Sequence, residues 1–379
     1  MTADHAGGTL RLTAARATAW ALLLGGWVGL GGVALSLTPR LIGVYALVAL
    51  WLLALGIAAT VATRDSLRAR SRRLALGACA LITAAALVGS TREAGLPALL
   101  VALAGWAGMT ALASGVVRSL RLAQAVRPGP PIAAASLGAI AAAIAIADPA
   151  DARMMALRLG ALVLAAAALL ALLQLDDRAG AAASRCRAGL FDCSLPAWPA
   201  GAWHDAAQWP ALLAGVAMLP MMAALPLMVL WCRATALAPQ AMVAVHFAAM
   251  FLPALLLRRH ATRLSARTLS LVCAALLVAG AAAVVWAPRP FDLLGVACTH
   301  GAAWSLAWSG QLWSPDRRSR QGTSPLRAAL GYAALTMGVG IAIEYAGPEG
   351  LALVQVALGV AAALACAYSL VVREHAAVG

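Results

Sequence analysis

Residues 17–38 read ATAWALLLGGWVGLGGVALSLT, a long apolar stretch without a charged side chain. A helix of about 20 such residues crosses a hydrocarbon core roughly 30 Å thick. Comparable apolar stretches follow at 41–62, 74–91, 95–117, 131–148, 154–174, 209–231, 238–257, 267–287, 291–313, 327–346 and 350–371. The sequence therefore predicts an all-α integral membrane protein with twelve transmembrane helices.

The composition excludes an ordinary soluble protein. Of the 379 residues, 63% are hydrophobic and only 11% are charged, whereas a soluble chain needs more charge to cover its surface. Residues 1–16 lack a cleavable signal, so we expect the first apolar stretch to stay in the membrane. The sequence contains no nucleophile–base set, phosphate loop or haem motif, and we expect neither an enzyme nor a resident cofactor.

The basic residues are distributed as in a membrane protein. The formal net charge is +14, and all 28 basic residues are arginines, most of them in short segments between apolar stretches. This pattern favours contact with anionic membrane lipid over nucleic acid. The arginines on one side of the predicted membrane are Arg40, Arg92, Arg153, Arg158, Arg233 and Arg289. All others fall on the opposite side, which predicts a bacterial inner-membrane protein with both termini in the cytoplasm.

The longest interruption between apolar stretches is 175–208, and it predicts a central cytoplasmic loop between two six-helix halves, 1–174 and 209–379. This layout resembles the major facilitator superfamily of transporters. The basic segments RDSLRARSRR (64–73) and RRHATRLSAR (258–267) occupy the positions of that superfamily's signature loop. The resemblance implies a substrate site near the bilayer midplane, between the two halves.

Acidic side chains are scarce inside the predicted spans. Asp148, Asp292 and Glu344 all fall near predicted span ends on the non-cytoplasmic side. A proton- or sodium-coupled carrier usually keeps a carboxylate at midspan, because that costly group is retained there only for function. Glu344 is the nearest candidate for such a role, and an interfacial position is the alternative.

Sulfur and imidazole side chains concentrate in two consecutive predicted helices. The first contains AMLPMMAALPLM (217–228), in which Met218 and Met222 are four residues apart. The second contains AMVAVHFAAMFLP (241–253), in which Met242, His246 and Met250 step by four. A step of four keeps side chains on one helical face, and both sets lie near midspan. Pro220, Pro226 and Pro253 can loosen these helices locally.

Thioether and imidazole ligands suit Cu(I), whereas magnesium and calcium prefer oxygen ligands. The pattern therefore predicts a metal site at Met218, Met222, His246 and Met250, with Met221 and Met242 secondary. The alternative is ordinary packing, because methionine is a flexible core residue and a membrane histidine can hydrogen-bond a neighbouring helix or an organic substrate.

The MxxxM of 218–222 and the HxxxM of 246–250 resemble the paired motifs of the CcoA-like copper importers, a major facilitator branch. The resemblance implies copper uptake into the cytoplasm, delivery to a cytoplasmic copper acceptor and service to cbb3-type cytochrome c oxidase assembly. Related carriers keep the architecture with another cargo. A carrier of a small organic solute, such as riboflavin or a drug-like compound, is therefore the alternative. A non-transporting membrane assembly factor is a third possible function.

A further cluster, CTHGAAWSLAWSGQLW (298–313), places His300, Trp304 and Trp308 at steps of four. These residues suit an auxiliary copper ligand or a stacking surface for a planar organic solute. In the central loop, Cys186, Cys193 and His204 are candidates for metal handover, although their spacing fits no standard metal motif.

Overall fold

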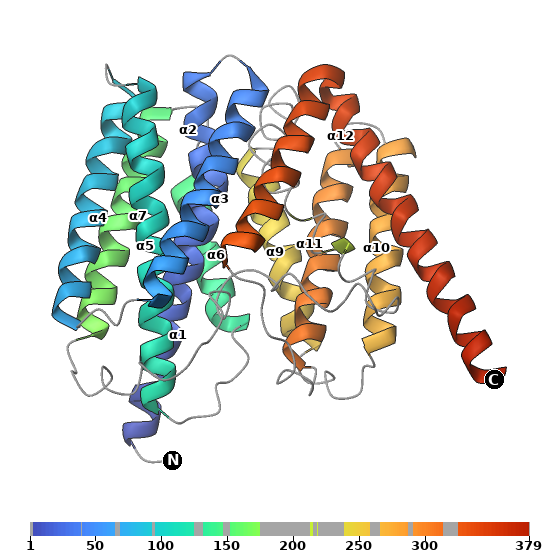
Figure 1. Cartoon of the computed structure of the whole chain (residues 1–379), viewed down its shortest axis with the longest axis horizontal. Helices are drawn as coiled ribbons and strands as arrows, with labels where there is room; N and C mark the ends of the chain where they lie inside the picture. Colours follow the sequence, from blue (N-terminus) through green and yellow to red (C-terminus); the bar gives the residue numbers. More distant parts are fainter. Residues whose placement is uncertain are drawn as a thin grey trace. The chain divides into compact units, whose positions relative to one another are not determined.

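A computed structural model of the chain describes residues 3–38, 40–64, 69–92, 95–124, 132–146, 152–174, 213–214, 218, 239–257, 266–286, 291–313 and 325–378 (Figure 1). These ranges are almost entirely helical. The helices before the predicted central loop are α1 (Ala3–Leu24), η1 (Gly25–Gly29), α2 (Leu30–Leu37), α3 (Leu41–Arg64), α4 (Ala69–Ser90), α5 (Gly95–Gln124), α6 (Ile132–Ile146) and α7 (Ala152–Leu173). Those after it are α9 (Pro239–Leu257), α10 (Ala266–Trp286), α11 (Phe291–Trp313) and α12 (Pro325–Val378).

The helices coincide with the predicted spans, apart from 209–231, which lies mostly outside the described residues. The last two spans form one continuous element, α12, which reverses direction at Gly347 with a φ of 61° (Figure 1). Only glycine adopts this backbone conformation readily. The first helix begins at Ala3, well before the predicted span, so Arg11 and Arg16 lie within it.

Two compact units divide the chain. The first comprises Met1–Leu195 with Ser324–Met337, and the second comprises Pro196–Thr323 with Gly338–Gly379. In the first unit, α4 packs against α5 and α7, and α1 packs against α5 and α6. In the second unit, α11 packs against both α9 and α10. The domain boundaries expected from the sequence stay predictions, because the central loop lies outside the described residues.

Glycines in the first helical run allow close packing in the first unit. A Cβ on Gly29 would lie 2.7 Å from a Cδ atom of Leu159 on α7, and one on Gly26 would lie 2.7 Å from Nε1 of Trp106 on α5. Gly25–Gly29 also forms one turn of π-helix inside the run. The Trp106 indole then donates a hydrogen bond of 2.7 Å to the carbonyl oxygen of Leu22. Small residues thus bring three helices into contact, as in other membrane bundles.

The outer surface of the described helices suits lipid. Large apolar side chains such as Leu81, Leu172 and Leu256 are exposed. Trp286 and Tyr345 are exposed near helix ends, where aromatic residues commonly meet the membrane interface. Hydroxyls within spans bond one turn back, as Thr83 does to the carbonyl of Cys79. This is a multi-pass membrane protein.

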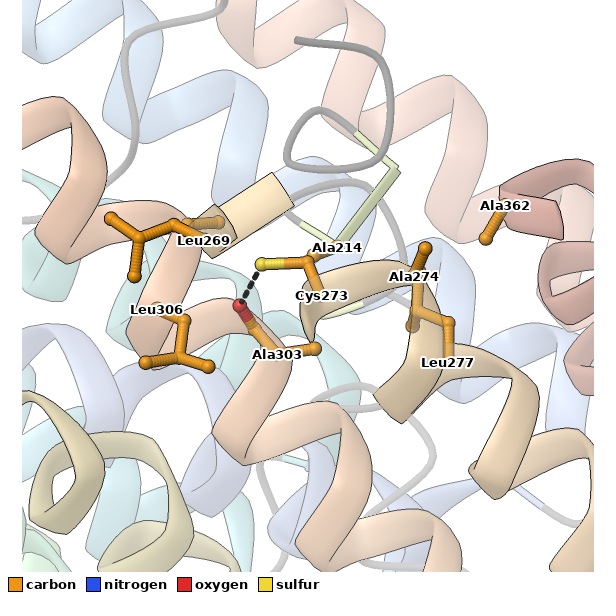
Figure 2. Close-up of a cluster of buried hydrophobic side chains, with 9 residues drawn as sticks. Ala214, Leu269, Cys273, Ala274, Leu277, Ala303, Leu306 and Ala362 are labelled. Carbon is orange, nitrogen blue, oxygen red and sulfur yellow. Dashed lines mark hydrogen bonds between the residues drawn. The ribbon is translucent and has the colours of Figure 1, made fainter. Parts of the chain in front are cut away.

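The second unit has a core where α10, α11 and α12 meet Ala214. Figure 2 shows the thiol of Cys273 on α10 directed at the carbonyl oxygen of Ala303 on α11, and the sulfur–oxygen distance is 3.3 Å. The buried residues of the cluster are Ala214, Leu269, Cys273, Ala274, Leu277, Ala303, Leu306, Ala307 and Ala362. Small side chains dominate it, so the helices approach closely.

Candidate functional site

His246 lies within α9 and is completely buried. Its Nδ1 is 2.8 Å from the carbonyl oxygen of Ala297 on α11. A carbonyl oxygen only accepts hydrogen bonds, so Nδ1 carries the proton and Nε2 of the neutral ring keeps its lone pair. Nε2 is buried and has no hydrogen-bond partner among the described residues. This nitrogen can accept a hydrogen bond from a solute or ligate a metal ion.

Met250 follows His246 by one helical turn and is also buried, with 2% of its surface exposed. Gly301 of α11 packs directly on this turn, because a Cβ there would lie 3.0 Å from the carbonyl oxygen of His246 and 3.1 Å from the amide nitrogen of Met250. The same helix pair is joined beyond Pro253, where the amide of Ala254 donates to Oγ of Ser305. α11 therefore fixes the turn of α9 that carries the imidazole.

The residues of the 298–313 cluster are described in part. Trp304 packs edge-on against Phe251 of α9, with ring centroids 5.9 Å apart. His300 is buried beside α10, since a Cβ on Gly280 would lie 3.3 Å from Cδ2 of its ring. His246 of α9 thus contacts α11 at Ala297, and His300 of α11 lies beside α10. The side chain of Trp308 lies outside the described residues.

The proposed metal ligands are described only in part. Met218 is helical and buried, with 3% exposure, and it follows Ala214 of the second unit's core by four residues. Met222 and Met221 lie outside the described residues, as do Cys186, Cys193 and His204, and so does the side chain of Met242. His246 and Met250 share one buried face, and the convergence of Met218 and Met222 with them stays a prediction.

The described residues contain no cluster of the usual metal-binding side chains. No three side chains of His, Cys, Asp or Glu gather there in a way that could hold a metal ion. Glu344 is partly exposed and lies three residues before the reversal at Gly347. Both alternatives for it, a coupling role and an interfacial position, stay predictions.

The sequence matches no family model and no curated protein. Solved structures match it almost from end to end. The nucleoside transporter NupG is similar with a TM-score of 0.60 and 16% identity over 96% of this chain and 98% of that chain. The xylose transporter XylE from E. coli, in a partially occluded inward-open conformation, gives a TM-score of 0.63 and 11% identity over 96% and 97%. The chain has the major facilitator fold.

A third structure with the major facilitator fold, a bacterial homologue of the human lysosomal transporter Spinster, gives a TM-score of 0.58 and 13% identity over 98% of this chain and 97% of that chain. The fold predicted from the six-plus-six layout is thus confirmed. The narrower resemblance to copper importers is not confirmed by these structures. Sequence analysis did not identify Ala297, Gly301 and Ser305 as supports of α9, although their steps of four on one helix were a usable signal.

Proposed function

We propose that this major facilitator chain is a secondary transporter of a small, uncharged organic solute. The observation that carries the proposal is the likeness, over 96% of the chain, to solved transporters named for a nucleoside and for xylose. His246 supplies a polar contact for such a solute, because its buried Nε2 accepts a hydrogen bond from a hydroxyl or N–H group. The surrounding apolar faces of α9 and α11 contact the rest of the solute.

The bond from His246 to Ala297 prepares this contact. It holds the ring in one tautomer and one orientation before the solute arrives, so little ordering remains to be done on binding. In the orientation suggested by the arginines, the protein lies in a bacterial inner membrane with both termini in the cytoplasm. Transport then follows from rocking of the two halves around the bound solute, as in other carriers built from repeats.

A second candidate function, copper uptake into the cytoplasm for cbb3-type oxidase assembly, is favoured by one observation. His246 presents Nε2 and Met250 lies buried one turn further along the same helix. An imidazole whose Nδ1–H donates to a backbone carbonyl is the usual form of a metal ligand. Met218 and Met222 would complete a neutral Cu(I) site.

Transport by the purified chain in liposomes separates the two functions. Uptake of labelled uridine, xylose, riboflavin and copper-64 under reducing conditions is compared for the wild type, His246→Leu and Met250→Leu. For an organic solute, Met250→Leu retains most uptake, because the two side chains have similar volumes. His246→Leu lowers the solute's apparent affinity about fivefold to tenfold, as expected for one lost buried hydrogen bond.

For copper, Met250→Leu and His246→Leu each abolish copper-64 uptake, since both remove a ligand. Copper-64 movement without movement of any organic probe therefore overturns the first proposal in favour of the second. A folded protein that moves none of the four probes argues against both and supports the assembly-factor alternative. Thermal unfolding of each variant in detergent checks that folding is preserved.

A further inference from the structure

A group of arginines lies at the first turn of α4, on the surface of the first unit. The segment 64–73 carries five arginines and one acidic residue, Asp65, and its last five residues, ARSRR, form the start of α4. The side chains of Arg72 and Arg73 are partly exposed. A molecule outside the protein therefore reaches both arginines without any separation of helices.

Arg72 is held in place by the neighbouring helix, α5. Its Nη1 donates a hydrogen bond of 2.7 Å to Oγ of Ser119. That hydroxyl in turn donates to the carbonyl oxygen of Gly115, one helical turn earlier, at 2.9 Å. The Ser119 oxygen is thus oriented to offer a lone pair to the guanidinium. Because serine carries no charge, Arg72 keeps its full positive charge while its position is fixed.

The position of these charges on the helix favours an anion nearby. The N-terminus of a helix carries a partial positive charge from its aligned peptide dipoles, so cations are disfavoured there and anions are favoured. Three arginines nevertheless fall within residues 69–73, and the sequences of α4 and α5 contain no acidic residue. Arg118 and Arg121 add positive charge on either side of Ser119 in the sequence. A bound anion would reduce the repulsion among these groups.

The surface of α4 changes from charged to apolar at the next residue. Leu74 is 68% exposed, and Leu81, about two helical turns further along the same face, is exposed as well. Large apolar side chains on the outside of a membrane helix contact the acyl chains of lipids. Arg72 and Arg73 therefore lie where the hydrocarbon core ends and the lipid headgroups begin.

We propose that Arg72 and Arg73 bind the phosphate of one anionic phospholipid, such as phosphatidylglycerol, with Ser119 as the positioning residue of Arg72. A guanidinium suits a phosphate, because its planar fork of N–H groups can form two parallel hydrogen bonds to the oxygens. The acyl chains of the lipid contact the exposed face of α4 at Leu74 and Leu81, which favours a lipid over free phosphate. The site belongs to the first unit and does not depend on the transport function proposed for His246.

Equilibrium binding of phosphatidylglycerol with a fluorescent acyl chain to the detergent-solubilised full chain tests this site. We expect saturable binding that weakens as the salt concentration rises. Arg72→Gln and Arg73→Gln should each weaken it about fivefold, the effect expected for one arginine near an anionic lipid. Ser119→Ala keeps every charge and should weaken binding about twofold, because Arg72 then loses its fixed position. Phosphatidylcholine, which has a phosphate but no net charge, should bind more weakly and respond little to these changes.

Arg92→Gln is the matched control, because it removes the same charge just beyond the opposite end of α4 and should leave the affinity unchanged. Thermal unfolding without added lipid checks that each variant folds, and Arg73→Gln keeps the bond between Arg72 and Ser119. The proposal is overturned if both arginine variants bind phosphatidylglycerol as the wild type and Arg92→Gln do. Displacement of the lipid by millimolar inorganic phosphate would also overturn it, in favour of a site for a free anion. Neither result depends on whether the chain moves a solute.

Discussion

Gly301 sets how closely α11 approaches the turn of α9 that carries His246 and Met250. A Cβ at this position would lie 2.9 Å from Cβ of Ala249 and 3.0 Å from the carbonyl oxygen of His246. Backbone atoms cannot move aside as a flexible side chain can, so the two helices must separate. We expect Gly301→Ala to lower the free energy of unfolding by about 1–3 kcal/mol, as overpacking usually does. Chemical denaturation in detergent measures this change.

Gly338→Ala provides the control in the same unit. Gly338 is exposed on α12, and a Cβ there would meet no atom within 4 Å. The substitution should leave stability unchanged or raise it by up to about 1 kcal/mol, because alanine favours the helix over glycine. Equal effects of the two substitutions would show that the α9–α11 contact does not depend on Gly301.

The sequence predicts some features of the candidate site and not others, for a physical reason. Periodicity reports which residues share one face of one helix, and it placed His246 with Met250 on this basis. The bond from His246 to Ala297 joins residues 51 positions apart, and helical periodicity carries no information about such contacts. The same limit applies to Trp304, whose packing against Phe251 of α9 joins residues far apart in the sequence.

Between helices of the first unit, Gly29 of η1 allows close packing against α7, as Gly301 of α11 does against α9. A Cβ on Gly29 would lie 2.7 and 2.8 Å from the two Cδ atoms of Leu159. Gly29→Ala should therefore destabilise the first unit by about 1 kcal/mol or more. Leu159→Ala leaves a cavity and should cost about 2–5 kcal/mol. In the double variant the new methyl group partly fills that cavity, so its loss of stability should be smaller than the sum of the two by at least about 0.5 kcal/mol.

Denaturation of the two single variants and the double variant gives this coupling energy directly. The pair Gly29→Ala with Met250→Leu, which changes the other unit, supplies the comparison and should be additive. If the changes in unfolding free energy of Gly29→Ala and Leu159→Ala are additive, the packing of α7 does not depend on this glycine.

At the scale of elements, apolar length predicted the positions of the described helices, and six of these are long and apolar enough to cross a membrane. The structure differs from this prediction at two features that the composition does not report. The π-helical turn at Gly25–Gly29 changes hydrogen bonding by one residue without changing the apolar pattern. The early start of α1 at Ala3 reflects a helix that continues beyond the apolar stretch into polar sequence. Neither feature alters the hydrophobicity from which spans are predicted.

The whole molecule combines the major facilitator fold with a sequence that matches no family model. Membrane helices are specified mainly by apolar length and by small residues at contacts, and many sequences satisfy both conditions. Structural likeness therefore persists at 11–16% identity, whereas side chains that select a cargo do not follow from it. In the proposed function, the cargo depends on a few polar groups such as Nε2 of His246.

The orientation of the molecule gives a final prediction, which rests on the arginines alone. Segments such as 64–73 and 258–267 are strongly basic, while the segments facing them carry isolated arginines such as Arg40 and Arg289. Basic segments stay in the cytoplasm during insertion. A fluorescent protein fused after Gly379 should therefore fluoresce in a bacterial host, and alkaline phosphatase fused after Gly347 should be active outside the membrane. A dark fusion at Gly379 together with an inactive phosphatase at Gly347 would reverse the orientation and make the proposed uptake an export.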